Sequence, residues 1–419
     1  KSGIPEKQFT HTVRNGKVTI CKYTGSGGAV NIPGTIDGLP VTEIGYRSFA
    51  FNRSITHVAI PLGVTTIADW AFNGCSNLTN AVIPDSVVNI RSAAFGGSGL
   101  TRVVLPASVT NIECRAFESL ENASEIVVDT DNPAYSSQGG VLFDKTRTTL
   151  IQWPNGKAAN YTIPSGVTRI GKMAFFNCGQ LTQVTFASSV DSIGASAFSQ
   201  CSGLTSLAIP ASVTNIGSGA FVNCLRMTAF TVDLLNPNYS SVEGILFNKN
   251  QDTLIHYPET KTGKYTIPPS VTTVDGFAFQ YCKGLTEITI PDTVTCLRES
   301  ALFATGLTHV TVPAGVTNIG HRAFGYNNNL KSIAIDPINP CYSSIDGVLY
   351  NKDQTMLIEC PGGFTGNCTV PASVTRLGSQ SFYSCGALTS VTFMGDAPSI
   401  DARDCAFHYS KPTVYYRPG

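Results

Sequence analysis

Charge is scarce in this chain. Only 13% of its 419 residues are Asp, Glu, Lys or Arg, and the formal net charge is zero. A polyanion or an acidic membrane surface binds strongly only to a basic field, so nucleic acid is not an expected partner. No run approaches the roughly 18 apolar residues of a membrane-spanning helix, so no membrane insertion is expected. The chain opens at KSGIPEKQF without a signal-peptide core, so we expect that an exported parent has lost its signal peptide.

The motifs of common enzymes and metal sites are also missing. The sequence contains no H-E-x-x-H, no G-x-S-x-G, no P-loop, no dinucleotide-binding fingerprint and no C-x-x-C. Its six histidines are scattered, without the spacing of metal ligands. We therefore predict that the chain is not an enzyme, with no catalytic residues, no metal and no cofactor.

Cysteine is present in an odd number, 13, so not all of the thiols can pair. Six of them lie three residues after a recurring phenylalanine: Cys75, Cys178, Cys201, Cys224, Cys282 and Cys385. Stacked coils would place neighbouring cysteines about 4.8 Å apart, within disulfide range. Parallel strands point such side chains the same way, however, so reduced, buried thiols are the favoured alternative to disulfides.

A repeat dominates the sequence. The segment Ile193–Pro210, IGASAFSQCSGLTSLAIP, carries a pattern that recurs from Ile44 onward, whose anchor residues, phenylalanines and one leucine, lie 22, 23 or 58 residues apart. A fixed period in the twenties indicates a solenoid of stacked coils. We predict that the anchor residues form the core; they are Phe49, Phe72, Phe95, Phe117, Phe175, Phe198, Phe221, Phe279, Phe324 and Phe382, with Leu302 in one slot.

The pattern also predicts the content of one coil. The alternation in L-T-x-V-x-I-P favours a short, half-buried strand that ends at proline. The spacing in G-x-x-A-F-x-x-C fits one or two helical turns that face inward. Insertions at 132–154, 236–258 and 339–361 begin with NPxYSS and are predicted to be projecting β-hairpins. Their polar tips lie at Asp144–Thr148, Asn248–Asp252 and Asn351–Gln354.

Three regions follow along the chain. Residues 1–40 are predicted to form an N-terminal β-hairpin cap and lead-in, with its turn at Asn15-Gly16, because a terminal coil would otherwise leave the core open. Residues 41–394 form the solenoid, in which a larger block recurs every 103 or 104 residues. Residues 395–419 are predicted to be a degenerate coil or cap.

The combined motifs carry a family resemblance. I-P-x-S-V-T-x-I-G-x-x-A-F-x-x-C-x-x-L-T-x-V-x-I-P, together with NPxYSSxxGVLFxK, resembles the BspA-like leucine-rich repeat family over roughly residues 30–410. The resemblance implies a leucine-rich-repeat superhelix, found mostly on exported or cell-surface proteins of bacteria and some protists, and adhesion or protein binding. It brings no fixed binding residues. We predict a repeat solenoid, a right-handed superhelix that is β-dominant, with short helical turns and three inserted β-hairpins.

A binding face can be proposed from the strand pattern. The third position of L-T-x-V should point outward, and its residues vary in charge and shape. The candidate binding face is His57, Asn80, Arg102, Glu125, Asn160, Gln183, Ser206, Lys264, Glu287, His309, Ser332, Asn367 and Ser390. The alternative is that these are arbitrary solvated positions. Trp70 is a candidate hot spot, and its alternative is partial burial against the next coil.

The sequence predicts a broad class of function. We predict a non-enzymatic interaction or adhesion module, secreted or on the cell surface, that binds a protein or glycan on a host or neighbouring cell. A passive scaffold or spacer for another domain is the alternative. An enzyme is the least expected.

Overall fold

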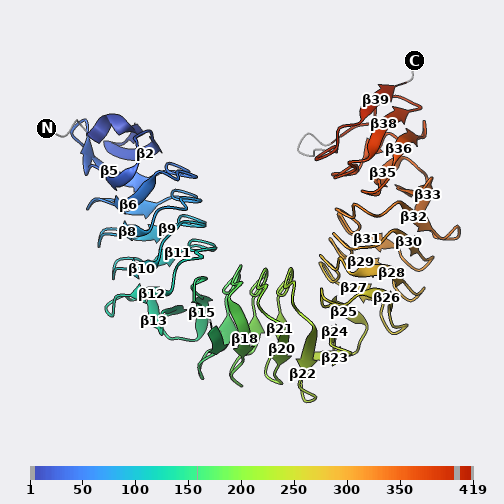
Figure 1. Cartoon of the computed structure of the whole chain (residues 1–419), viewed down its shortest axis with the longest axis horizontal. Coiled ribbons are helices and arrows are strands. Elements are labelled where there is room, and N and C mark those ends of the chain that lie inside the picture. Colours follow the sequence, from blue (N-terminus) through green and yellow to red (C-terminus); the bar gives the residue numbers. More distant parts are fainter. Residues whose placement is uncertain (1–4, 158, 401–405, 417–419) are drawn as a thin grey trace. The chain divides into compact units, whose positions relative to one another are not determined.

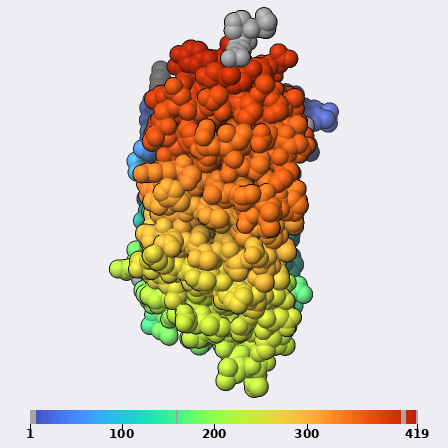
Figure 2. Space-filling model, turned by 90° about the vertical axis from the view of Figure 1, so that its right-hand side faces the viewer, coloured from blue at the N-terminus to red at the C-terminus, as the bar shows by residue number. Residues whose placement is uncertain are grey.

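The computed structural model describes residues 5–157, 159–400 and 406–416. The chain forms two compact units, Lys1–Leu204 with Ser212–Cys224 and Thr205–Ala211 with Leu225–Gly419. Within each unit the strands stack in chain order (Figure 1). In the second unit this order shows as successive colour bands from yellow to red (Figure 2). The predicted solenoid of stacked coils is confirmed.

Each regular coil contributes one long and one short strand, and each kind forms parallel ladders with its neighbours. The long strands are β3 (Gly28–Asn31), β6 (Ile55–Ala59), β8 (Asn80–Val82), β10 (Arg102–Leu105), β12 (Glu125–Val128), β16 (Ala159–Thr162), β18 (Leu181–Thr185), β20 (Ser206–Ile209), β22 (Ala229–Val232), β26 (Gly263–Thr266), β28 (Leu285–Thr289), β30 (His309–Val312), β32 (Ser332–Ile335), β36 (Gly366–Val370), β38 (Leu388–Phe393) and β39 (Thr413–Tyr416). The short strands are β7 (Thr66–Ile67), β9 (Asn89–Ile90), β11 (Asn111–Ile112), β17 (Arg169–Ile170), β19 (Ser192–Ile193), β21 (Asn215–Ile216), β27 (Thr273–Val274), β29 (Cys296–Leu297), β31 (Asn318–Ile319) and β37 (Arg376–Leu377).

Burial alternates along the long strands. In β10, Val103 and Leu105 are buried while Arg102 and Val104 are exposed, as one buried face of a strand requires. The anchor phenylalanines and Leu302 are all buried. Several of their rings stack in series, for example Phe72 on Phe95 at 5.2 Å between ring centroids. The core is therefore a column of in-phase apolar side chains between the two ladders.

The predicted helical turns are wrong. The segments around the anchors are successive tight turns, and no α-helix occurs in the parts of the chain that the structure describes. The amides of Trp70, Phe72 and Gly74 donate to carbonyls of the next coil, whereas those between them donate three residues back. Trp70 and Gly74 accordingly have positive φ values of 61° and 68°. A helix would direct every amide along its own axis, so stacking overrides the helical spacing here.

The insertions are half-coils and do not project as predicted. Each is a three-stranded antiparallel sheet whose last strand pairs in parallel with the next short strand, as β15 does with β17. These strands are β13 (Tyr135–Gln138), β14 (Val141–Asp144), β15 (Thr149–Gln152), β23 (Tyr239–Val242), β24 (Ile245–Asn248), β25 (Thr253–His256), β33 (Tyr342–Ile345), β34 (Val348–Asn351) and β35 (Met356–Glu359). The residues of β14 before Asp144 are buried, so this strand joins the core.

The residue after each insertion takes an anchor position. The Trp153 amide donates to the Ala174 carbonyl at 2.8 Å, the bond that an anchor phenylalanine makes elsewhere. Its ring packs against Phe175 with 5.8 Å between centroids. Tyr257 and Cys360 make the corresponding backbone bonds in the other insertions. A separation of 58 residues between anchors therefore contains one further anchor position, which the insertion supplies.

The NPxYSS motif closes the edge of the coil that precedes each insertion. Asn132 has no exposed surface. Its amide nitrogen donates to the Pro106 and Val109 carbonyls, and its amide oxygen accepts from the amides of Ala134 and Tyr135. Tyr135 Oη accepts the Ile112 amide at 2.9 Å. Because backbone groups at the end of a ladder need partners, the motif has a structural role.

The N-terminal segment packs on the end of the core. It comprises the 3-10 helix η1 (Pro5–Gln8) and strands β1 (Phe9–Arg14), β2 (Lys17–Tyr23), β4 (Thr35–Ile36) and β5 (Leu39–Ile44). β1 and β2 pair antiparallel through Asn15 and Gly16, whose positive φ values suit a two-residue hairpin turn. At the other end, the Phe407 ring stacks on Phe382. Residues 401–405 and 417–419 of the predicted C-terminal segment lie outside the described residues.

Candidate binding surfaces

The long-strand ladders bring members of the predicted binding face together in pairs. The facing pairs are His57 and Asn80, Arg102 and Glu125, Asn160 and Gln183, Lys264 and Glu287, His309 and Ser332, and Asn367 and Ser390; Ser206 faces Ala229. Most of these side chains are exposed or half-buried. The parallel register therefore places the predicted residues in rows across neighbouring coils.

Each insertion interrupts these rows. The Ile126 amide of β12 donates to the Gly140 carbonyl at 2.8 Å, so the inserted turn pairs with this strand edge. A Cβ atom on Gly140 would lie 2.8 Å from the Glu125 Cβ atom, and its φ is +80°. A Cβ atom on Gly244 would lie 2.7 Å from the Ala229 Cβ atom, and one on Gly347 would lie 2.5 Å from the Ser332 Cβ atom. The face is thus a set of separate patches, each ended by a glycine turn that no larger residue fits.

Opposite charges on the face pair with each other. Arg102 Nε lies 2.9 Å from Glu125 Oε1, and Lys264 Nζ lies 2.7 Å from Glu287 Oε2. Both pairs are substantially exposed, so each contributes no more than about 1 kcal/mol. The two cations and the two carboxylates of the predicted face therefore balance each other.

One residue of the predicted face is not available for binding. Ser390 is buried, with 7% of its surface exposed. Its hydroxyl donates to Asn367 Oδ1 at 2.8 Å, and β39 pairs along the free edge of β38. The prediction that Ser390 is exposed was wrong because the last strand covers that edge.

Trp70 is half-buried, in line with the alternative to an exposed hot spot. Its ring lies 5.3 Å from the Arg47 guanidinium carbon and 6.0 Å from that of Arg115. These residues occupy the same turn position in successive or nearby coils, and all three have positive φ. Cation–π contacts of this kind contribute about 0.5–1 kcal/mol at exposed sites. The Trp70 ring is therefore already in contact with two arginine side chains of its own chain.

Most of the in-phase cysteines bond to the preceding coil. Cys75 Sγ donates to the Phe49 carbonyl at 3.0 Å, and Cys201 Sγ donates to the Phe175 carbonyl at 2.9 Å. Burial raises the pKa of the Cys75 thiol to about 12. The cysteines for which the structure gives a placement are all free thiols. The repeat position thus suits a small apolar group with a weak donor.

Sequence reasoning missed a cavity of about 240 Å³ beside the third insertion. Its lining includes Arg322, Gly325, Glu359, Gln380 and Tyr383. These residues come from the coils before and after the insertion and from β35, away from the long-strand face. The one signal in the sequence was Gly325, which stands where the first block has Glu118.

Nothing in the described ranges resembles a metal site or a membrane span. No group of three or more His, Cys, Asp or Glu side chains is placed to hold a metal ion among those residues. No helix among them is long and apolar enough to cross a bilayer.

Parallel ladders that stack coil on coil over apolar cores are typical of a leucine-rich-repeat solenoid. A family model described as the BspA type leucine rich repeat region matches residues 42–157, 152–262, 255–343 and 364–413. The chain therefore belongs to the BspA-type leucine-rich repeat family, and this identification is confirmed. No curated protein matches the chain.

Solved structures of bacterial leucine-rich repeat proteins are similar to the chain, and the first of those below shows the same fold. A leucine-rich repeat protein from Eubacterium ventriosum is 24% identical, with a TM-score of 0.51, over 80% of this chain and 95% of that one. A leucine-rich cell surface protein from Faecalibacterium prausnitzii is 23% identical, with a TM-score of 0.41, over 100% of this chain and 94% of that one.

Proposed function

We propose that the chain is a non-enzymatic interaction module, secreted or displayed at a cell surface, that binds a protein or glycan through its long-strand face. The register of the ladders supports this proposal, because it holds side chains of different charge and shape in fixed rows over a packed core. Repeat proteins bind partners through such extended surfaces. Membership of a family typical of surface proteins supports the location.

The test is a binding screen with a charge exchange on the face. The full chain is applied to arrays of extracellular proteins and glycans, and any hit is titrated. Arg102→Glu with Glu125→Arg preserves the ion pair but reverses its direction, so the fold should persist while recognition changes. We expect at least a tenfold loss of affinity.

A matched control lies on the short-strand side. Arg91 and Glu113 form an ion pair at 3.7 Å, and Arg91→Glu with Glu113→Arg should leave binding unchanged. Equal losses in the two exchanges, or no loss in either, would contradict binding through the face. An absence of any saturable partner would favour the spacer alternative.

A further inference from the structure

The first and third insertions create junctions at which two full coils meet across a half-coil. The first junction joins residues 112–119 to 171–177, and the third joins 319–326 to 378–384. Side chains 58 residues apart touch there: Asn177 Nδ2 donates to Ser119 Oγ at 3.1 Å, and His321 Nε2 lies 3.2 Å from Ser379 Oγ. The half-coil offers fewer turn residues than a full coil, so space opens at its turn side. The two junctions fill this space differently.

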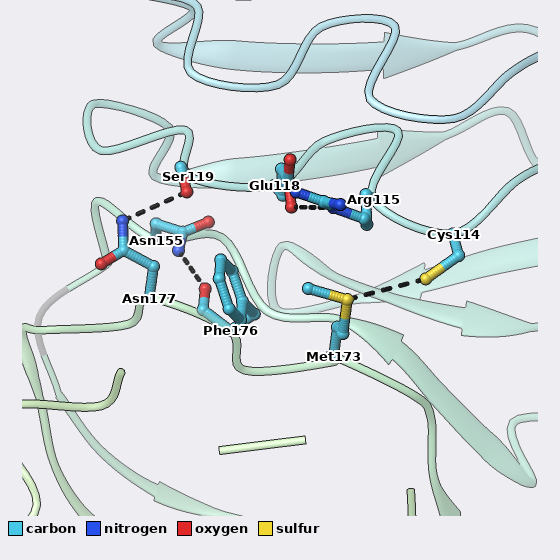
Figure 3. Close-up of polar contacts among 8 residues, drawn as sticks. All are labelled: Cys114, Arg115, Glu118, Ser119, Asn155, Met173, Phe176 and Asn177. Carbon is cyan, nitrogen blue, oxygen red and sulfur yellow. Dashed lines mark hydrogen bonds and ion pairs between the residues drawn. The ribbon is translucent and has the colours of Figure 1, made fainter. Parts of the chain in front are cut away.

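At the first junction the arginine charge is balanced by a carboxylate of the chain itself (Figure 3). Arg115 Nε donates to Glu118 Oε2 at 2.6 Å, and the Glu118 side chain is almost completely buried. This hydrogen bond is the largest cause of the raised pKa of Arg115. The Arg115 cation thus has a protein carboxylate as its partner.

At the third junction the arginine is kept and the carboxylate is lost. In the block alignment Arg322 corresponds to Arg115 and Gly325 to Glu118. The cavity of about 240 Å³ lies at this place, and both Arg322 and Gly325 line it. The difference of one side chain therefore leaves a cation beside a cavity.

Arg322 packs against two aromatic rings, but its hydrogen bonding is incomplete. Its guanidinium carbon lies 4.8 Å from the Phe303 ring centroid and 4.9 Å from that of Tyr383. Its Nε atom is buried without a hydrogen-bond partner, and so is Gln380 Oε1. Arg322 forms no ion pair with any carboxylate that the structure describes. A buried donor without a partner is costly, so a bound acceptor would be favoured.

The remaining charges leave the cation unbalanced. Glu359 is the one carboxyl among the described lining residues, and burial raises its pKa to about 8 despite the Phe324 amide and the Arg322 charge. It is therefore mostly protonated at neutral pH and can donate a hydrogen bond. His321 lines the same cavity, and an adjoining hollow shares His321 and adds Arg376.

We propose that this cavity binds a small ligand through a carboxylate, which pairs with Arg322 in the place that Glu118 takes beside Arg115. Arginine recognises carboxylates through parallel hydrogen bonds. The cavity is smaller than typical drug-sized sites of about 300–1,000 Å³, so it suits a single sugar-acid or acidic amino-acid unit. The sugar acid and the acidic amino acid would present the same group, a carboxylate, to Arg322. The site lies apart from the long-strand face and does not depend on its function.

The experiment is calorimetric titration of the full chain at neutral pH. One arm uses D-galacturonate against its neutral counterpart D-galactose. The other uses N-acetyl-L-glutamate amide against N-acetyl-L-glutamine amide. We expect saturable binding of at least one acid, and binding at least tenfold weaker for its neutral counterpart. The acid that binds more tightly shows whether the carboxylate comes from a sugar acid or from an acidic amino acid.

Two arginine variants localise the effect. Arg322→Gln should weaken binding of the acid tenfold or more, and Arg115→Gln at the first junction should leave it unchanged. Melting temperatures of both variants verify folding. Gly325→Glu gives the cavity a carboxylate of its own and should also abolish binding. Its Cβ would lie 3.1 Å from a Phe303 ring carbon, so it counts only if the variant melts cooperatively.

Several outcomes would overturn the proposal. They are no saturable binding of either acid, equal binding of acid and neutral counterpart, or unchanged binding in Arg322→Gln. The exchange of Arg102 and Glu125 should not affect this site, so a failure here is separate from a failure of the proposed surface interaction.

Discussion

The anchor phenylalanines are among the largest fully buried side chains of the core. Phe198 is completely buried, and its ring stacks on Phe175 at 4.7 Å and Phe221 at 6.0 Å. Phe198→Ala should lower the free energy of unfolding by about 3–5 kcal/mol, because it leaves a cavity between stacked coils. Denaturant titration measures the change. The exposed Ser206→Ala serves as control, and an unmoved transition for Phe198→Ala would refute the assigned stacking.

Glu359 should make stability depend on pH. Burial raises its folded-state pKa from 4.5 to about 8, so the folded chain holds a proton that the unfolded chain has lost between these values. Stability from this group is therefore complete below about pH 4.5 and falls as pH rises toward 8, by at most about 1.4 kcal/mol per pH unit.

Glu359→Gln should remove this dependence. The first insertion has Gln152 at the same position, so glutamine fits there. The variant and the wild type are compared by denaturant titration at several pH values from 5 to 8. Parallel curves would mean that Glu359 is ionised in the folded state.

At this scale the sequence predicted the core better than the surface. Phe198 and its equivalents recur in phase, and burial follows directly from recurrence. Ser390 recurs in phase too, yet β39 covers it, because the end of a solenoid breaks the rule that its interior obeys. Trp153 could not be identified as an anchor, since it lies in a segment without the surrounding repeat pattern.

The conformation of the turn segments around the anchors could not be predicted from the sequence. Their apolar spacing fits a helix, and the residue at the Trp70 position varies among arginine, alanine, serine, methionine, phenylalanine, glutamine and, once, glycine, all with positive φ. Glycine signals a left-handed conformation, but it stands at this position only in Gly219, and the other residues give no such signal. Hydrogen bonds to the next coil impose the conformation, and no single coil reveals them.

The insertions depend on one asparagine each, which gives a prediction. Asn339 has no exposed surface. Its side-chain nitrogen donates to the Pro313 and Val316 carbonyls, and its side-chain oxygen accepts from the backbone amides of Cys341 and Tyr342. Asn339→Ala leaves these backbone groups unpaired, and should lower the free energy of unfolding by about 2–4 kcal/mol. Thermal unfolding tests this, with the exposed Asn329→Ala as control. Equal stability of the two variants would argue against a structural role for the motif.

For the whole molecule, the two candidate sites differ in how visible they are in the sequence. The rows on the long-strand face follow from strand alternation and the repeat period, which together place Arg102 and Glu125 at the same outward position of neighbouring coils. The cavity at Arg322 follows from one departure between blocks, Gly325 for Glu118, at a place where a half-coil leaves space. Such a site becomes apparent only when blocks are aligned on the structure.

The block of 103 or 104 residues should behave as an interchangeable unit. Bonds between coils join residues about one coil apart, such as Thr228 N to Thr205 O and Phe175 N to Ala197 O, so stability is a sum of neighbour contacts. Deleting residues 176–279 joins Phe175 to Gln280 in phase, and should leave a folded solenoid with a cooperative transition.

A deletion that breaks the phase provides the control. Removing residues 176–227 instead places a long strand directly after an anchor, so the neighbouring coils can no longer stack their apolar columns. Circular dichroism and thermal unfolding should therefore separate the two deletions. If the in-phase deletion also loses its transition, contacts beyond neighbouring coils hold the molecule together, and the duplicated block is not an independent structural unit.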